Sequence, residues 1–587
     1  MPEIASRQFA ALFQKTLAKG GRLAAADVQA LTQASAKIGK AHEKQAADGL
    51  LALLKHDREF DAFEVAPAKK ALGVLLGVSS GRLPADLERV LTHAVPAANV
   101  KVKHYDLSFD FSKDGASFPA RAVVTLERAA KGTSILEVDP ERLSISAVTV
   151  NGKPVPFELR AGRLHVDAPG AKALDITYRV KPQDVRGNAD TAYGLIRDKY
   201  ADRMWTLTWP YNTGALFPSN SHPSDGATAK VTLKVEAGHT AYASGNPTGA
   251  STFEMKAQAP AYSVAVYDAP GFRREHAGRA NNGVEVTGLG LENAIAPATR
   301  EAYRKAAISA VDYFSGWLGQ YDYGNTLALV ELPGGLGGME HTSAVAIMLG
   351  NARSPDLARE TAVHETAHHW FGDNLRIASW GDFWMSEGFT NYATYRYFGA
   401  TEGEGKYQQL LSRAKADVRA TLEANPHALS ADAHTDVNEI FDDVPYEMGP
   451  WILRMLEVKV GRPAFDALLK DWFHANRQKA VSTGDFVKFA RAKTGQDFTT
   501  FFKEWNSITQ VPQLDGEVKL SGNKATVTLK APAGTPSGIE VPLKLEGEGG
   551  QSKLVTVKPG QPLEVDAGFP VKRFTWDPSV TVLADVR

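Results

Sequence analysis

The chain has 587 residues, of which 43% are hydrophobic and 23% are charged. These proportions are typical of a folded globular protein and exclude a largely disordered chain. The 66 basic residues nearly balance the 67 acidic ones, so no overall charge indicates binding to nucleic acid or to an anionic membrane. The chain contains no cysteine, which excludes disulfides, thiolate metal ligands and a cysteine nucleophile.

We expect a soluble protein. No apolar run reaches the roughly 18 to 20 residues that a membrane-spanning helix needs, and the first residues show neither the basic start nor the apolar stretch of a secretory signal. The lack of a visible signal favours a cytoplasmic location. An extracytoplasmic location stays open, because a signal can be removed from the mature protein.

The length predicts several domains, and the spacing of apolar residues divides the chain into four segments. Residues 1–94 have helical spacing and predict a helical extension, for which we expect a packing or docking role. Residues 95–275 show alternation of apolar and polar positions, first between residues 105 and 111, and predict a β-rich domain. The hairpin-turn pair Asn151-Gly152 supports this interpretation.

Helical spacing returns over residues 276–510, which also hold the most distinctive motifs. Alternation resumes over residues 511–587, where Gly and Pro turns separate the expected strands, and predicts a small β-sandwich. The predicted fold class is therefore multidomain α+β.

The run His364-Glu365-Thr366-Ala367-His368 matches the pattern H-E-x-x-H. Two histidines four residues apart on a helix lie on one face, so both imidazoles can reach one metal ion. A helix is predicted here because Ser354 is a good N-cap, Pro355 suits the first helical position and Gly372 can end the helix.

Glu387 is the predicted third metal ligand. It lies on a second predicted helix, over residues 382–398, with Asp382 as its cap and Gly399 at its end. Catalytic zinc typically has three protein ligands and keeps a further position for water. We therefore predict one Zn²⁺ per chain, held by His364, His368 and Glu387. The alternatives are a pair of partly buried helix histidines and an exposed carboxylate at a helix start.

Glu365 is the predicted general base. It lies beside the open metal position, where a carboxylate can accept a proton from water whose pKa the metal has lowered to about 7. His369 is predicted to be structural, because it lies about 100° around the helix from His368. Asn391, one turn after Glu387, is expected either to support a ligand histidine through its amide oxygen or to be an ordinary surface residue.

These residues resemble a known family. The runs from His364 to Asp373 and from Asp382 to Phe389 resemble the gluzincin signature of the M1 zinc aminopeptidases, which places the third ligand at the spacing of Glu387. The run Gly337-Gly338-Met339-Glu340-His341 is similar to that family's G-x-M-E-N exopeptidase motif. The run Tyr446-Glu447-Met448-Gly449-Pro450 looks like the segment that carries its catalytic tyrosine.

The resemblance implies a fold and an activity. The resemblance is weak and covers residues 96 to 587. It implies a saddle-like β-rich domain, a thermolysin-like, mostly helical catalytic domain and a C-terminal β-sandwich. This is a short form, without the large C-terminal helical domain that many members have. The resemblance also implies a zinc metallopeptidase that removes N-terminal residues from peptides by means of metal-activated water. Tyr446 would donate to the oxyanion. The expected substrate-binding residues are Gly337, Gly338, Met339, Glu340 and His341, with Glu340 as the partner of the substrate's α-ammonium group.

Two departures from the family pattern affect the expected amine site. His341 replaces the usual Asn and would add a titratable group near the substrate amine. In the β-rich domain, where members often have a Gln or Glu, the sequence reads Trp205-Thr206-Leu207-Thr208-Trp209-Pro210-Tyr211. Glu340 would then provide most of the amine recognition, assisted by cation–π contacts from aromatic rings.

Two other functions stay open at this point. One is a zinc endopeptidase or an epoxide-type hydrolase on the same scaffold, because the metal chemistry does not choose the substrate. The other is a catalytically inactive scaffold or binding module. The expected partners are peptides with a free N-terminus, without nucleic acid and without membrane insertion, and no role is assigned to residues 1–94.

Overall fold

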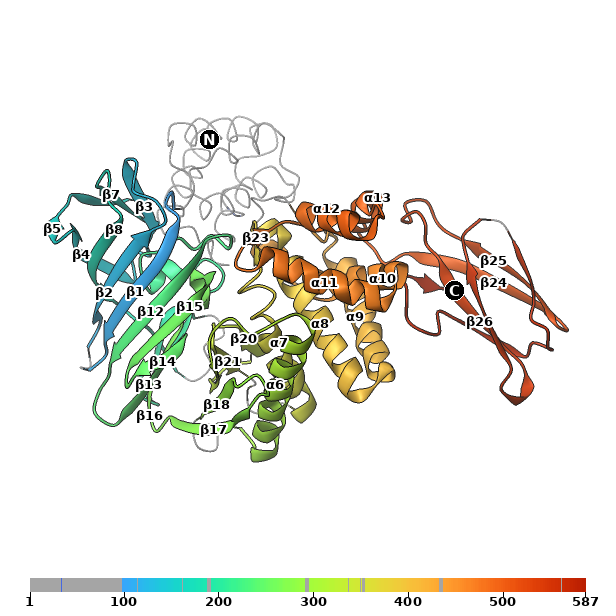
Figure 1. The fold of residues 1–587 in the computed structure, drawn as a ribbon, viewed down its shortest axis with the longest axis horizontal. Helices are drawn as coiled ribbons and strands as arrows, with labels where there is room; N and C mark the ends of the chain where they lie inside the picture. The colour runs from blue at the N-terminus through green and yellow to red at the C-terminus, as the bar shows by residue number, and fades with distance from the viewer. Residues whose placement is uncertain are drawn as a thin grey trace.

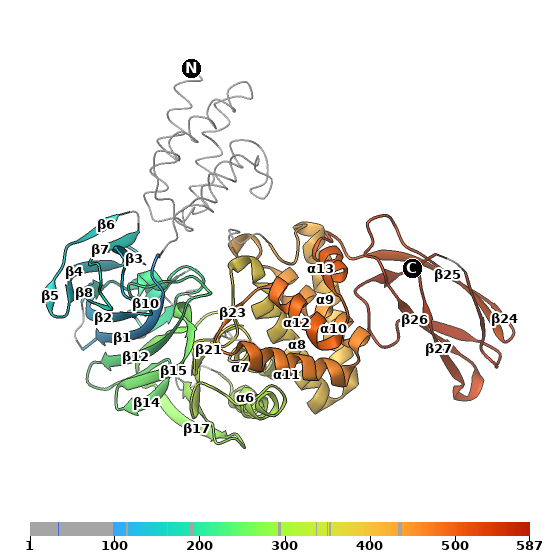
Figure 2. The same cartoon turned by 45° about the horizontal axis from the view of Figure 1, so that its top comes forward.

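The computed structural model describes residue 33 and residues 98–587, except residues 113–114, 161, 187–191, 291–294, 336, 349, 351–353, 432–436 and 561. The helical extension predicted over residues 1–94 therefore lies outside the described residues, apart from residue 33. The described chain forms three parts along the long axis of the molecule: a β-rich part, a mostly helical part and a small β part that ends the chain (Figure 1). Figure 2 shows the same order after a rotation.

The β-rich part is built on one large sheet and two small ones. The large sheet has the order β14 (Asn246–Gly249), β15 (Thr252–Pro260), β12 (Gly226–Lys234), β1 (Val102–Asp110), β2 (Phe118–Leu126), β8 (Ala173–Val180), β4 (Leu143–Val150), β5 (Lys153–Pro154). The second sheet has the order β13 (His239–Ala243), β16 (Val266–Pro270), β11 (Arg203–Leu207), β10 (Gly194–Asp198), β9 (Gln183–Val185). The third has the order β3 (Thr133–Glu137), β7 (Arg163–Asp167), β6 (Phe157–Arg160).

The alternation in the sequence explains the large sheet. On β1, Tyr105, Leu107 and Phe109 are buried while the residues between them are half-buried, so the strand places its apolar side chains on one face. The strand pairs with β2 antiparallel and with β12 parallel. The Asn151-Gly152 hairpin is confirmed: both residues have positive φ, 52° and 74°, and join β4 to β5.

The mostly helical part contains a five-stranded sheet that the sequence analysis did not predict. Its order is β17 (Arg273–Arg279), β18 (Glu285–Gly290), β19 (Thr326–Glu331), β21 (Ala344–Met348), β20 (Gly337–Met339). The strands β18, β19 and β21 run parallel, and β20 pairs with β21 antiparallel. Every residue of β19 and β21 is buried, and the apolar residues 327–330 and 344–348 form continuous runs without the alternation that identifies a half-exposed strand.

Helices form most of this part. They are α6 (Pro297–Trp317), α7 (Pro355–Ala367), α8 (Trp384–Glu402), α9 (Glu404–Ala424), α10 (Gly449–Val460), α11 (Arg462–Asn476), α12 (Thr483–Thr494) and α13 (Thr499–Asn506). Short turns and bridges connect the larger elements: η3 (Thr213–Ala215), η4 (Ala261–Ser263), β22 (Arg376–Ile377), η6 (Trp380–Asp382), η7 (Val437–Glu439), the π-helical η8 (Val444–Met448) and β23 (Ala480–Val481).

Helix α8 lies in the middle of this part, and nearly all of its residues are buried. The sequence predicts an end at Gly399, but the helix continues to Glu402 and ends at Gly403, which has a φ of 98°. Gly399 has a packing role instead, because a Cβ atom there would lie 3.0 Å from the Cβ of Tyr407 on α9. The glycine therefore lets two helices approach closely rather than ending one of them.

The last part is a two-sheet sandwich, as predicted from the sequence. One sheet has the order β28 (Leu563–Asp566), β25 (Lys524–Lys530), β24 (Gln513–Ser521), β30 (Asp585–Val586), and the other has the order β27 (Ser552–Val557), β26 (Val541–Glu546), β29 (Arg573–Trp576). The short turn η9 (Glu548–Gly550) lies between β26 and β27. Alternate residues Val541, Leu543 and Leu545 are buried between the sheets.

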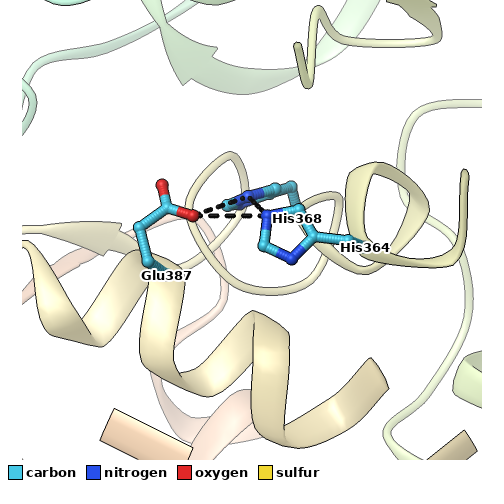
Figure 3. Close-up of side chains that lie close together, drawn as sticks. All are labelled: His364, His368 and Glu387. Atoms are coloured by element: carbon cyan, nitrogen blue, oxygen red, sulfur yellow. Dashed lines mark hydrogen bonds and ion pairs between the residues drawn. The ribbon is translucent and has the colours of Figure 1, made fainter. Parts of the chain in front are cut away.

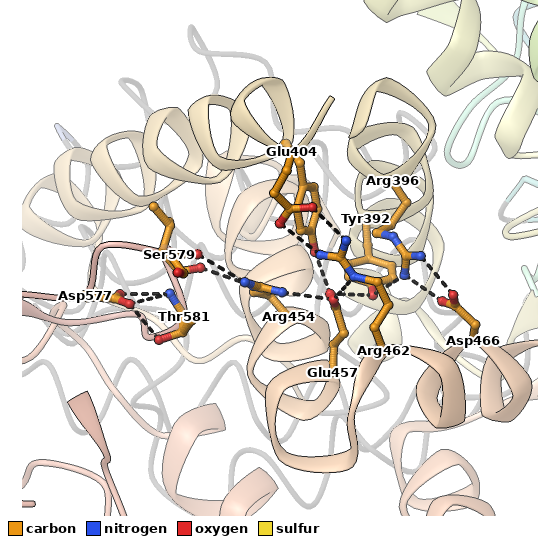
Figure 4. A network of polar contacts seen from close by, with 12 residues as sticks. Tyr392, Arg396, Glu404, Arg454, Glu457, Arg462, Asp466, Asp577, Ser579 and Thr581 are labelled. Carbon is orange, nitrogen blue, oxygen red and sulfur yellow. Dashed lines mark hydrogen bonds and ion pairs between the residues drawn. The ribbon is translucent and has the colours of Figure 1, made fainter. Parts of the chain in front are cut away.

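A buried polar network joins the sandwich to the helices (Figure 4). Arg454 on α10 donates to Glu457 at 2.9 Å and to the backbone carbonyls of Ser579 and Val580, each at 3.1 Å. Glu457 also accepts hydrogen bonds from the hydroxyls of two tyrosines on α8 and α9. One guanidinium therefore satisfies a buried carboxylate and two carbonyls of the terminal segment at once.

Within the described residues, no helix is both long and apolar enough to cross a membrane.

We predict that Arg454→Met lowers the free energy of unfolding by about 1 to 3 kcal/mol, because it removes the donor to the Ser579 and Val580 carbonyls, while Glu457 keeps the guanidinium of Arg462 as a partner. Thermal and urea unfolding followed by circular dichroism measure the change. The control is Lys305→Met, which breaks a pair with Glu301 in which both side chains are more than half exposed, and it should leave the free energy of unfolding nearly unchanged. Equal effects of the two substitutions would contradict the structural role of Arg454.

Candidate metal centre

Helix α7 presents the first two predicted ligands. Its N-cap is Ser354, whose hydroxyl accepts a hydrogen bond from the Leu357 amide at 3.3 Å, and Pro355 occupies the first helical position. His364 lies in the last turn and His368 is the C-cap residue, still with helical backbone angles. Gly372 follows the helix with a φ of 112°, and a Cβ atom there would lie 2.8 Å from Nδ1 of His368. The turn therefore requires glycine.

The three predicted ligands meet at one point (Figure 3). The Nε2 atoms of His364 and His368 are 3.0 Å apart, and Oε2 of Glu387 is 3.3 Å from the first and 3.2 Å from the second. Ligand atoms around a tetrahedral zinc ion, at about 2.0 to 2.2 Å from it, are roughly 3.3 to 3.6 Å apart. The observed triangle is close to that geometry, so the prediction that these residues converge is confirmed.

The chemistry of the donor atoms also fits a metal. Oε2 of Glu387 is buried and has no hydrogen-bond partner among the described residues, and a cation at the centre of the triangle would satisfy it. Burial raises the pKa of Glu387, and the charge of the adjacent imidazoles, when they are protonated, lowers it to about 2. A metal ion that replaces those protons would supply positive charge at the same place. Two imidazoles and one carboxylate are common zinc ligands.

Each ligand histidine is fixed by a hydrogen bond at its other ring nitrogen. Nδ1 of His368 lies 2.9 Å from the carbonyl oxygen of Phe371, and Nδ1 of His364 lies 2.6 Å from Oδ1 of Asn391. Both partners are acceptors, so each Nδ1 carries the proton and each Nε2 has its lone pair free for a metal. Of the two interpretations of Asn391 from the sequence, the structure favours support of His364, because Asn391 is buried and its amide oxygen contacts that ring.

Glu365 and Glu340 are buried next to this triangle. One ligand atom from each of Glu340, Glu365 and His368 lies within 4.8 Å of the others. Burial raises the pKa of Glu365 to about 7 and also raises the pKa of Glu340. A Cβ atom at Gly338 would lie 2.4 Å from the Glu365 side chain, so the backbone of β20 runs directly over this carboxylate.

Tyr262 is a residue of the site that the sequence analysis missed. It lies on η4 in the β-rich part, is buried, and donates its hydroxyl to Oε1 of Glu340 at 3.0 Å. The next residue, Ser263, contacts Thr342 through both backbone and side chain. No local motif signals the contact between Tyr262 and Glu340, because these residues are 78 positions apart in the sequence.

His341 and His369 lie in the surrounding structure, away from the ligand triangle. Nδ1 of His341 is 2.7 Å from the hydroxyl of Tyr267, and burial lowers its pKa to about 3. The imidazole is therefore uncharged at neutral pH, and the expectation of a titratable group at this position is wrong. Nε2 of His369 accepts a hydrogen bond from the Ser343 amide at 2.9 Å, which agrees with the structural role predicted for this histidine.

Tyr446 lies in the π-helical turn η8 and is half-buried. Its ring lies 6.2 Å from the ring of His364, nearly parallel to it, and burial keeps the pKa of its hydroxyl well above the usual value. The hydroxyl is therefore a proton donor at neutral pH. Aromatic rings adjoin it: Phe383 and Phe441 contact Tyr446, and Trp209 contacts both of them. The segment Trp205–Tyr211, which departs from the family pattern, thus places the indole of Trp209 near Tyr446.

Comparison with known proteins agrees with this geometry. Residues 313–505 match the peptidase family M1 domain. The chain is 22% identical over 453 residues to tricorn protease-interacting factor F2 of Thermoplasma acidophilum, which covers 73% of this chain and 56% of the relative. It is 23% identical over 533 residues to puromycin-sensitive aminopeptidase of Caenorhabditis elegans, which covers 83% and 54%. The chain spans a little over half the length of these two relatives.

Solved structures share the fold. An M1 zinc metallopeptidase from Deinococcus radiodurans superposes with a TM-score of 0.59 at 24% identity, over 70% of this chain and 94% of that chain. A mutant of the Deinococcus protein has been solved with a Tyr-Ser-Ala substrate. Aminopeptidase A of Legionella pneumophila, in complex with aspartic acid, superposes with a TM-score of 0.67 at 17% identity, over 83% and 59%.

We predict that Glu387→Gln and Glu365→Gln separate metal binding from the other roles of the site. Glu387→Gln removes the charge of a ligand and should lower bound zinc to a small fraction of one ion per chain, whereas Glu365→Gln should retain it. Both changes preserve side-chain size, and both residues are buried in the same site, so each is the control for the other. Zinc is measured by inductively coupled plasma mass spectrometry after dialysis. Full zinc content in Glu387→Gln would contradict the assignment of this ligand.

Proposed function

Because the chain carries a peptidase family M1 domain, we propose that it is a zinc-dependent aminopeptidase acting on peptides with a free N-terminus. One observation carries the proposal beyond hydrolysis in general: the Glu340 carboxylate lies within 4.8 Å of atoms of Glu365 and His368. A carboxylate at a fixed position beside the metal site is a partner for the α-ammonium group of a peptide. The aminopeptidase names of relatives and the peptide bound by a structural neighbour support this choice.

Zinc held by His364, His368 and Glu387 would supply a Lewis acid for the scissile carbonyl and lower the pKa of water at its open position. Glu365 accepts the proton of the attacking water and later donates it to the leaving amine. Burial raises the pKa of the Glu365 carboxyl, which strengthens the group as a proton acceptor.

Tyr446 and Glu340 complete the proposed mechanism. The hydroxyl of Tyr446 donates a hydrogen bond to the oxyanion that develops on the carbonyl, and its raised pKa keeps the proton in place. Glu340 binds the α-ammonium group, and the hydroxyl of Tyr262 holds one of its oxygens in position. The motif also includes Gly337, Gly338 and Met339, which form strand β20 and would place its backbone beside the substrate. His341 follows Glu340 in the chain.

We predict that the enzyme releases the first residue from a free peptide and does not cleave the same peptide after N-acetylation. Glu340→Gln should lower kcat/KM for the free peptide about 10- to 100-fold, because a charge-assisted hydrogen bond contributes about 1.5 to 3 kcal/mol. Products are identified by liquid chromatography and mass spectrometry. Internal cleavage of the acetylated peptide at a similar rate would indicate an endopeptidase, and turnover of epoxides without peptide cleavage would indicate the other alternative.

We predict that Tyr446→Phe lowers kcat about 10²- to 10³-fold and leaves KM nearly unchanged, because the hydroxyl acts on charge that develops in the transition state. Steady-state kinetics on an aminoacyl reporter measure both constants. The matched control is Tyr313→Phe, on α6, where the ring contacts Trp317 and Tyr397, and it should retain activity. A change confined to KM would contradict the proposed role of Tyr446.

A further inference from the structure

Asn391 contacts two different parts of the site through the two ends of one amide. Its Oδ1 lies 2.6 Å from Nδ1 of His364, and its Nδ2 donates to the backbone carbonyl of Tyr446 at 2.9 Å. The residue lies one helical turn after Glu387 on α8 and is 8% exposed. A single buried side chain therefore links a metal ligand to the turn that carries the proposed oxyanion donor.

The orientation of this amide follows from the chemistry of its partners. The carbonyl oxygen of Tyr446 only accepts hydrogen bonds, so the group that faces it is the NH₂ end of Asn391. Oδ1 then faces His364 and accepts the proton of Nδ1. The lone pair of His364 is consequently on Nε2, the atom that points to the ligand triangle.

The two ligand histidines differ in this respect. Nδ1 of His368 is paired mainly with a backbone carbonyl of its own loop, that of Phe371 at 2.9 Å, with Oγ1 of Thr390 farther away at 3.3 Å. Nδ1 of His364 is paired with the side chain of Asn391, which also holds the turn η8 through the carbonyl of Tyr446. His364 is also the more exposed of the two, with 15% of its side chain accessible against 2% for His368, so it depends more on a specific partner for its orientation.

The turn η8 packs closely on α8 at the same place. A Cβ atom at Gly388 would lie 2.7 Å from Cα of Gly449 and 3.1 Å from the carbonyl oxygen of Pro445. The backbones of α8 and of the segment around η8 are thus in direct contact, one turn before Asn391. The ring of Tyr446 in turn lies beside the ring of His364. A shift of the turn therefore moves Tyr446 relative to the metal ligands.

We propose that Asn391 is a positioning residue that couples metal binding to the placement of Tyr446. Its carbonyl end orients His364 for the metal, and its amide end fixes the backbone of η8. The kinetic consequence rests on the proposed function, whereas the coupling itself does not. Ordering of His364 by zinc then stabilises the turn through the shared amide, and loss of the amide uncouples the two.

Two substitutions separate the two ends. Asn391→Asp keeps an oxygen acceptor for His364 and replaces the donor to Tyr446 with a second oxygen, which repels that carbonyl. It should leave the zinc Kd within about threefold of the wild type and lower kcat about 10- to 100-fold, because a displacement of about 1 Å in a reacting group can cost about 10²-fold. Asn391→Leu removes both ends and should in addition raise the zinc Kd about 10- to 100-fold.

Zinc Kd is measured by competition with a chromophoric chelator, and amide hydrogen exchange of Val444–Met448 is followed by mass spectrometry with and without zinc. Zinc should slow exchange of this turn in the wild type and not in Asn391→Leu, and Asn391→Asp should exchange faster than the wild type when zinc is bound. The control is Asn476→Asp, whose amide also donates to a backbone carbonyl, that of Trp472, and which should change neither quantity.

The outcomes separate the possible explanations. An Asn391→Asp variant with wild-type exchange and kcat, or an Asn391→Leu variant with wild-type zinc Kd, overturns the proposal. So does a loss of zinc affinity and kcat in both variants that merely follows a lowered thermal midpoint. If the wild-type chain cleaves no peptide but the zinc and exchange results are as expected, the coupling stands and the aminopeptidase function falls.

Discussion

Compensation of buried negative charge is the constraint on which this site depends. Three carboxylates, those of Glu340, Glu365 and Glu387, are buried beside two imidazoles. Burial disfavours an ionised carboxylate unless a cation or a proton accompanies it, and the raised pKa values of Glu340 and Glu365 express this cost. The proposed zinc ion and substrate ammonium group would compensate part of this negative charge. Binding of each cation would therefore be coupled to release of protons from the site.

Residues from both larger parts of the fold hold Glu340, the carboxylate that is proposed to bind the substrate's ammonium group. The loop after β20 belongs to the five-stranded sheet, yet the β-rich part holds it through Tyr262 and Ser263 on one side and Tyr267 on the other. The turn after helix α7 contributes the imidazole of His369, which accepts a hydrogen bond from the Ser343 amide. Ser343 has a φ of 59°, an unusual value for a residue with a side chain. The contacts from several elements fix this loop and so fix the distance between Glu340 and the metal ligands.

The sequence was sufficient for the part of the site that is encoded locally. The spacing of His364 and His368 is a property of one helix, and Ser354 and Pro355 begin that helix as predicted. Glu387 was predicted from its place on the next predicted helix, and the family resemblance implied the same spacing. The contacts of Tyr262 with Glu340 and of Asn391 with Tyr446 join residues 78 and 55 positions apart, and no periodicity or motif reports such pairs. The buried strands β19 and β21 escaped prediction for a related reason, since a strand covered on both faces has no polar positions to mark its period.

The bare backbone at Gly338 limits how this site can be redesigned. A side chain at this position would overlap the side chain of Glu365, so a substitution there would displace the proposed general base. Variation that alters selectivity is confined to positions where the neighbouring atoms leave room. Met339, the next residue along the strand and only half-buried, is the nearest such position on the same strand.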